Sequence, residues 1–178
     1  MRLPLPAILR SDAPAAVLLV RLAVGLVFLS EGVQKWIRPE DVGAGRFAQI
    51  GIPWPEVMGP FVGTAEIVCG VLVLVGLFAR LAAVPLLAVM SVAIVSTKIP
   101  ILIGSGYWIF SGPSRGLGGF WDMAHESRTD FAMTMGALFL ALVGAGPISL
   151  DARLLGRTRA RTRVSSAAVN DRRDPELR

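Results

Sequence analysis

The sequence predicts an all-α membrane protein. In this prediction four transmembrane helices form one bundle, both termini are cytoplasmic, and a structured outer loop joins the third and fourth helices. The 178-residue chain is 53% hydrophobic and 17% charged, whereas a soluble domain carries about 25% charged residues. Its apolar residues gather in runs long enough to cross a bilayer as helices, which satisfy their own backbone hydrogen bonds. No run alternates polar and apolar residues as a barrel strand does.

The chain is expected to divide into three segments. Residues 1–14 form a cytoplasmic N-terminal segment, residues 15–150 hold the four-helix transmembrane domain, and residues 151–178 form a basic cytoplasmic tail. The tail carries eight arginines and no apolar periodicity, so we expect it to be disordered. The first apolar run is longer than a signal-peptide core, and no clean cleavage site follows it. It is therefore predicted to remain as the first span.

Four apolar runs define the predicted spans. Their approximate bounds are residues 15–36, 57–78, 81–103 and 130–147. A spanning helix needs about 20 residues, which these runs approach or exceed. Pro85 and Pro100 lie in the third run and are predicted to kink it, because proline interrupts the helical hydrogen-bond ladder.

The three connections differ in length. Residues 79–80 alone separate the second span from the third, which predicts a tight helical hairpin. Residues 38–56 are expected to hold a short interfacial helix broken by Pro53 and Pro55, and residues 104–129 are rich in glycine and aromatic residues. The four tryptophans and the single tyrosine all fall on this outer side. They indicate either an aromatic belt at one membrane interface or a structured cap over the bundle.

Arginine positions predict the orientation, because cytoplasmic loops are enriched in lysine and arginine. With four spans, both termini lie on one side. That side would hold Arg2, Arg10, Arg80 and the cluster Arg153, Arg157, Arg159, Arg161 and Arg163. The other side would hold Arg38, Arg46 and Arg115. We therefore place both termini in the cytoplasm, with the chain in the cell (inner) membrane.

Several charged residues fall inside the predicted spans. A charge at the bilayer centre costs about 2.5–3.5 kcal/mol on insertion scales, so such residues should face the bundle interior and have partners. Counting about 1.5 Å per helical residue puts Arg21 about 9 Å and Glu66 about 16 Å above the inner surface. Arg21 is then the cation nearest in depth, and we predict that it contacts Glu66 directly or through one water.

A second group of charges shares an outer level. Glu31, Lys35 and Lys98 lie about 24–30 Å up by the same count, and the chain just before the fourth span adds His125, Glu126 and Asp130. We expect Glu31, Lys35, Lys98 and at least one of those three to converge in a polar cavity. The candidate polar cluster is therefore Arg21, Glu31, Lys35, Glu66, Lys98, His125, Glu126 and Asp130. It is interpreted either as a functional site or as ion pairs that hold the bundle together.

Composition excludes several kinds of site. The chain has one cysteine, Cys69, which excludes an intrachain disulfide, a CxxC pair and a cysteine metal site. The single histidine, His125, is too little for haem or a multi-histidine site, so no metal is predicted and no catalytic residue is assigned. The basic charge is concentrated in the tail, and no nucleic-acid partner is expected.

Three stretches together resemble one known family: "RLAVGLVFLSEGVQKW", "GIPWPEVMGPFVGTAEIVCGVLVLVGLFARLAAVPLLAVM" and "GFWDMAHESRTDFAMTMGALFLALVGAGPISLDARL". In this order they resemble the DoxX family of small bacterial four-helix membrane proteins, over about residues 17–155. The most specific pieces are Arg21-x-x-x-Gly25 with Gly32 and Lys35, the Gly63/Glu66/Gly70 block, and the closing Gly-Pro-Ile-Ser-Leu-Asp. The resemblance implies a membrane subunit beside redox enzymes, in quinone-linked thiosulfate oxidation or oxidative-stress complexes.

Three functions are carried forward. The first is a membrane subunit or partner of a redox system, in which a quinone is the expected ligand and a redox enzyme subunit the expected partner. The second is a small transporter or proton path that uses the intramembrane charges. The third is a membrane scaffold or assembly factor without a ligand. The chain is not expected to be an autonomous enzyme, and a homo-oligomer is left open.

Overall fold

The structure, a computed structural model, describes residues 13–113, 116 and 118–154, and all of its regular elements are helical. The helices are α2 (Val17–Ile37), α3 (Pro39–Val42), α4 (Ala44–Ile50), α5 (Pro55–Val75), α6 (Ala79–Ala93), the π-helix η1 (Ile94–Lys98), α7 (Ile99–Ile103), α8 (Phe120–Glu126) and α9 (Arg128–Val143). Residues 150–154 add a last helical turn. The predicted N-terminal segment, apart from residues 13–14, and the predicted tail beyond residue 154 lie outside the described residues.

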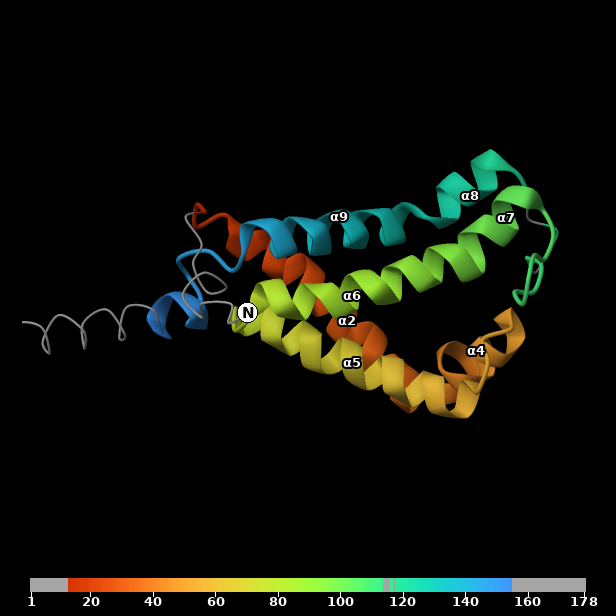
Figure 1. Ribbon diagram of the computed structural model, residues 1–178, viewed down its shortest axis with the longest axis horizontal. Coiled ribbons are helices and arrows are strands. Elements are labelled where there is room, and N and C mark those ends of the chain that lie inside the picture. Colours follow the sequence, from red (N-terminus) through yellow and green to blue (C-terminus); the bar gives the residue numbers. More distant parts are fainter. Residues whose placement is uncertain (1–12, 114–115, 117, 155–178) are drawn as a thin grey trace, which may run out of the picture.

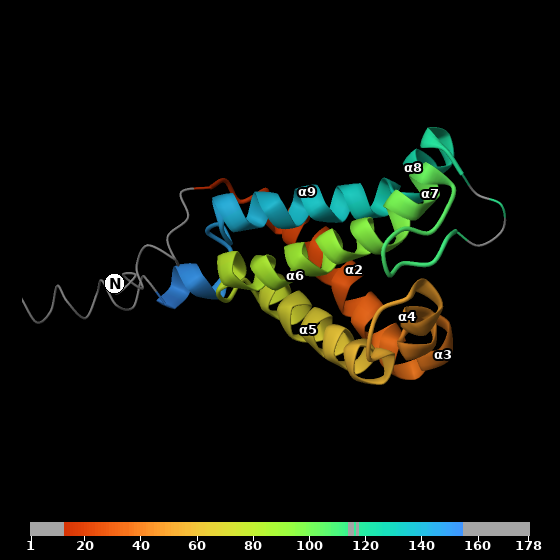
Figure 2. The same cartoon turned by 45° about the vertical axis from the view of Figure 1, so that its right-hand side comes forward.

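The bundle consists of two antiparallel helix pairs (Figure 1). The most extensive contacts join α2 to α5 and α6 to α9. The pairs lie close together where residues 76–78 connect α5 to α6, and they diverge toward α4 and α7, as both views show (Figure 2). We call the first of these the inner end and the second the outer end, following the predicted orientation.

Three helical segments in the described part of the chain are long and apolar enough to cross a membrane. They are Val17–Ile37, Pro55–Val75 and Ala79–Ile103. The prediction of the first three spans is therefore confirmed on length and composition. The fourth helix, α9, has 16 residues and packs along α6, and its role as a span stays a prediction.

Glycines allow α2 and α5 to approach closely. A Cβ atom on Gly32 would lie 2.6 Å from the carbonyl oxygen of Gly63, and a Cβ atom on Gly25 would lie 3.0 Å from that of Gly70. Small residues on both helices thus form the contact between them. Because the helices run antiparallel, this contact also fixes which residues stand opposite each other.

Two connections differ from the prediction. The turn between the second and third spans is residues 76–78, not 79–80, because Gly76 ends α5 with a φ of +67° and Ala79 already belongs to α6. In the first connection, α3 and α4 both end before Pro53, and Pro55 is the first residue of α5. The prolines therefore break no helix. Proline suits a first helical position, since the N–H it lacks would have no partner there.

The third span is irregular at one of its two prolines. Pro85 lies inside α6, which continues on both sides of it. The helix is therefore not interrupted at Pro85. Pro100 is the second residue after η1, and the N–H of Ile99 between them donates to the carbonyl of Ile94, five residues back. Proline has no N–H for the carbonyl four residues before it and its ring crowds that carbonyl, which a wider π turn accommodates.

Candidate functional site

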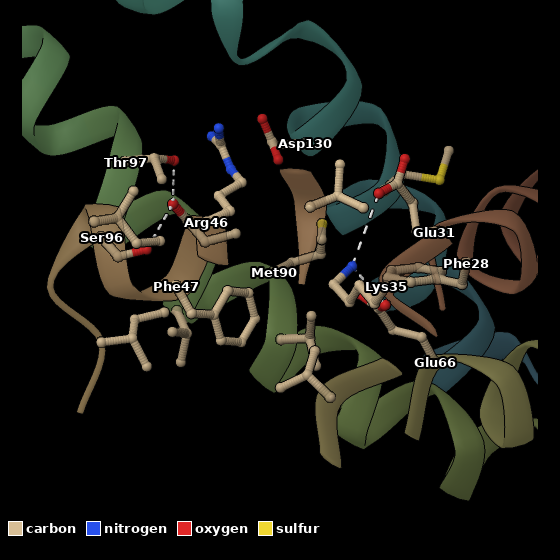
Figure 3. A pocket seen from close by; sticks show the side chains of 18 of the residues that line it. Phe28, Glu31, Lys35, Arg46, Phe47, Glu66, Met90, Ser96, Thr97 and Asp130 are labelled. Carbon is tan, nitrogen blue, oxygen red and sulfur yellow. Dashed lines mark hydrogen bonds and ion pairs between the residues drawn. The ribbon is translucent and has the colours of Figure 1, made fainter. Parts of the chain in front are cut away.

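A pocket of about 580 Å³ opens between the two helix pairs in the outer half of the bundle (Figure 3). Ligand pockets in proteins measure about 300–1,000 Å³. Its walls are mostly apolar and include Val27, Phe28, Phe47, Ile50, Met58, Phe61, Val62, Val89, Met90, Val92 and Met133. Its charged lining residues are Glu31, Lys35, Arg46, Glu66, Lys98 and Asp130. The site is therefore an apolar cavity with charged groups at defined points.

The most deeply buried charges in the pocket are Lys35 of α2 and Glu66 of α5. Lys35 Nζ lies 2.7 Å from Glu66 Oε2, and the two side chains are only 10% and 2% exposed. Side chains on a helix lean toward its N-terminus. On antiparallel helices Lys35 therefore leans inward and Glu66 leans outward, so that they meet between their own levels.

The predicted contact between Arg21 and Glu66 is wrong for the same physical reason. Arg21 leans toward the N-terminus of α2, which is the inner end, and therefore away from Glu66. It is 2% exposed and donates to the carbonyl oxygens of Val73, Leu74, Ala145 and Ile148. Depth along the helix axis did not predict the partner of Arg21, because side chains on antiparallel helices lean in opposite directions.

Glu31 completes a three-residue group with Lys35 and Glu66. Lys35 Nζ lies 3.8 Å from Glu31 Oε2, one helical turn away. The Glu31 side chain is half exposed, in contrast to that of Glu66. One ammonium group thus stands between a buried carboxylate and an accessible one.

A second ion pair joins η1 to α9 at the wall of the pocket. Lys98 Nζ lies 2.9 Å from Asp130 Oδ2 and also donates to the carbonyl oxygen of Glu126, at 2.9 Å. The side chains of His125 and Glu126 are exposed and do not line the pocket. His125 instead lies beside Arg128, whose Nη2 is 3.0 Å from its Nε2. Of the predicted outer cluster, the structure brings Glu31, Lys35, Lys98 and Asp130 to the pocket.

Two hydroxyl groups on η1 also line the pocket. Thr97 Oγ1 donates to the carbonyl oxygen of Ala93 at 2.6 Å, and Ser96 Oγ lies 3.5 Å from the same oxygen (Figure 3). Neither residue was singled out from the sequence. Their position just before Pro100 could have indicated them, because a proline there favours an irregular helical turn and π-bulges often mark functional sites.

Arg46 of α4 is a further lining residue that sequence reasoning did not select. It is exposed, and its guanidinium makes no hydrogen bond or ion pair with any described residue. Figure 3 places it near Asp130, on the side of the pocket away from Glu66. The sequence offered no signal for this position, because it depends on how α4 folds back over the bundle.

The inner end holds a separate charged group, which we call the inner clamp: Arg21 and Asp151. Asp151 is 2% exposed and accepts hydrogen bonds from the backbone N–H groups of Phe78, at 2.9 Å, and Ala79, at 3.4 Å. It therefore satisfies N–H groups at the start of α6, while Arg21 satisfies carbonyls at the end of α5. Burial raises the pKa of the Asp151 carboxyl, whereas the two N–H donors and the charge of Arg21 act against this rise.

The aromatic residues at the outer end favour one of the two interpretations given above. All four tryptophan side chains are exposed and none lines the pocket, as expected of a belt at a membrane interface. Phenylalanines occupy the pocket wall instead. The loop after α7 is nevertheless tied down, since Tyr107 Oη donates to the carbonyl of Val95 and Ser111 N donates to that of Ile50.

Comparisons with known proteins match the chain to membrane proteins. The DoxX family model matches residues 16–99. A protein named "Uncharacterized membrane protein Rv3486", from Mycobacterium tuberculosis, is 48% identical over 155 residues, which cover 87% of this chain and 91% of that protein. The "Inner membrane protein YphA" of Escherichia coli is 28% identical over 142 residues, 79% of this chain and 91% of that protein. No solved structure matches the chain.

Proposed function

This chain is an integral membrane protein of the DoxX family, and we propose that it binds a lipid-soluble quinone in the outer pocket as a membrane subunit or partner of a redox system. A quinone combines an apolar ring and tail with two polar oxygens. The pocket combines apolar walls with the buried Lys35–Glu66 pair and the hydroxyl groups of Ser96 and Thr97. Such a mixture of apolar walls and few polar groups is typical of small-molecule sites.

The observation that carries this proposal is where the pocket opens. Phe61 of α5 and Val92 of α6 both line it, and both are more than half exposed. Phe61 and Val92 thus come from different helix pairs, one from α5 and the other from α6. In a membrane that surface meets lipid, so a lipid-soluble molecule can enter sideways without crossing water.

The packing of the inner half speaks against the transporter or proton-path alternative. Between the pocket and the inner clamp the bundle is filled by Val24, Val73, Leu86 and Leu140, each no more than 2% exposed. A continuous path would need polar groups or space at that depth. The scaffold alternative gives no reason for a buried ion pair that faces a cavity, because such a pair is costly to bury and weak evidence of stabilisation.

The proposed topology is four spans with cytoplasmic termini, with α9 as the fourth. A 16-residue helix is about 24 Å long, somewhat less than the hydrocarbon core of about 30 Å, and α8 continues beyond its outer end. A reporter fused after Arg163 should be active only in its cytoplasmic form. Activity of a periplasmic reporter at that position would contradict the topology.

Ligand identification tests the function directly. The full chain would be purified in mild detergent, and its bound lipids extracted and measured by mass spectrometry. We expect quinone in near-stoichiometric amount, and much less in Phe61→Ala or Lys35→Met. Arg38→Met is the matched control, since Arg38 forms an exposed ion pair with Asp41 outside the pocket. Absence of quinone from protein purified out of quinone-containing membranes would contradict the proposal. A dehydrogenase recovered in the same preparation would identify the redox partner.

A further inference from the structure

The hydroxyl groups on η1 present oxygen lone pairs, not hydrogens, to the pocket. A hydroxyl has one hydrogen to donate and two lone pairs to accept with. Thr97 gives its hydrogen to the carbonyl of Ala93, and Ser96, 1% exposed, directs its own toward the same carbonyl. Both side chains therefore act as hydrogen-bond acceptors toward a ligand.

The charged lining residues add further hydrogen-bond acceptors to the pocket. Carboxylates only accept hydrogen bonds, and ammonium groups only donate them. Lys35 stands between two carboxylates, those of Glu66 and Glu31. Lys98 is engaged by Asp130 and by the carbonyl of Glu126. Each lysine is thus held by a carboxylate, whereas each carboxylate keeps lone pairs free.

One charged lining group makes no ion pair or hydrogen bond with a described residue, and it lies across the pocket from Glu66. Arg46 carries five N–H donors and has no partner among the described residues. Figure 3 places Glu66 and Arg46 on opposite sides of the cavity. The same view draws Ser96 and Thr97 on the Arg46 side, so the pocket offers acceptors at both ends, Glu66 at one and the two hydroxyl oxygens at the other.

We propose, on the basis of the proposed function, that the pocket binds the reduced hydroquinone form of its ligand more tightly than the oxidised quinone. Quinone carbonyls can only accept hydrogen bonds, so they leave the oxygens of Glu66, Ser96 and Thr97 without a donor. A hydroquinone hydroxyl donates to those acceptors and still accepts from Lys35 at one end or Arg46 at the other. Tighter binding of the reduced form raises the midpoint potential of the bound couple, by about 30 mV for each tenfold difference in affinity.

The test compares the two redox forms of one probe. Decylubiquinone and decylubiquinol would be titrated separately, without oxygen, into the purified full chain, with affinity measured by calorimetry. We expect decylubiquinol to bind about tenfold more tightly or better, the effect of one hydrogen bond to a charged acceptor. Equal affinities, or tighter binding of the oxidised form, would overturn the inference and leave the proposed function standing. If neither form binds, the proposed function itself fails.

Two variants and a control locate the acceptors. Glu66→Gln replaces a carboxylate oxygen by a donor, and Thr97→Val removes an oxygen without changing the side-chain shape; each should reduce the preference for decylubiquinol several-fold. Thr97→Val keeps the test valid if Glu66→Gln fails to fold. Thr64→Val is the matched control, because Thr64 also donates to a carbonyl four residues back, at 2.8 Å, but is exposed and outside the pocket. A preference unchanged in both pocket variants would contradict the assignment.

Discussion

At the inner end, Arg21 and Asp151 are buried. Their hydrogen bonds go to backbone groups, and their opposite charges attract each other. At the outer end, Lys35 and Glu66 are buried almost as deeply, yet both line a cavity. Exposure alone does not separate these two regions. What separates them is the use of the polar atoms, because the inner group satisfies the ends of α5 and α6 whereas the outer group keeps acceptors free. In this bundle, buried charge indicates a binding site only where it faces space.

The largest expected effect is on the inner clamp. Arg21→Met would leave the carbonyls of Val73, Leu74, Ala145 and Ile148 without their donor, and would leave Asp151 without its neighbouring cation. Removal of one partner from a buried charged group costs about 3–5 kcal/mol. Thermal unfolding in detergent should therefore occur at a much lower temperature, while Arg38→Met should unfold like the wild type. Similar unfolding temperatures for the two variants would remove the contrast between the ends.

A smaller loss is expected when the outer ion pair is broken. Lys35→Met leaves the Glu66 carboxylate buried without a cation, at a cost of about 1–3 kcal/mol, and water in the pocket limits the loss. Adding Glu66→Gln should recover part of it, so a double-mutant cycle between these two positions should give a coupling of about 1 kcal/mol. The effects of Arg21→Met and Glu66→Gln on the free energy of unfolding should instead be additive, because the two residues share no partner. Coupling between those two would show that the ends are not independent.

The pH dependence of stability should show the effect of burying the Asp151 carboxyl group. Burial raises the pKa of this carboxyl in the folded protein, so the folded state holds its proton more tightly than the unfolded state does. This tighter proton binding stabilises the folded state below the ordinary carboxyl pKa near 3.9. The stabilisation is lost as the pH rises through the raised pKa of Asp151 in the folded protein. The difference in unfolding temperature between wild type and Asp151→Asn should change across that window. Asp41→Asn, an exposed control, should follow the wild type at every pH.

The smallest effect on stability is expected at Pro100. Alanine there restores an N–H that can bond to the carbonyl of Ser96, so the π turn can tighten to an α turn. The global change should stay within about 1 kcal/mol, but Lys98, Thr97 and Ser96 would rotate relative to α9. We expect weaker quinone binding with little change in unfolding temperature. Loss of stability without loss of binding would assign η1 a structural role only.

The length of the apolar runs was enough to predict the first three spans, because it depends on local pattern alone. The level shared by Glu31, Lys35 and Lys98 also followed from counting along helices. The partner of Arg21 did not, since its acceptors are backbone carbonyls at the end of another helix, and no residue type encodes them. Asp151 was quoted within the closing Gly-Pro-Ile-Ser-Leu-Asp stretch but was assigned to the tail. Its burial depends on how residues 144–151 fold back against α5 and α6.

The divergence of the two helix pairs has a mechanical consequence. The pairs are joined at the inner end by the turn of residues 76–78 and by the inner clamp, so this end is the natural pivot. The pocket lies far along the helices from it, and sixteen or so residues of helix measure about 25 Å. Over that lever arm, a rotation of about 5° moves the outer ends by roughly 2 Å. The width of the cavity can therefore follow the thickness of what occupies it, while the side chains beside the pivot keep their contacts.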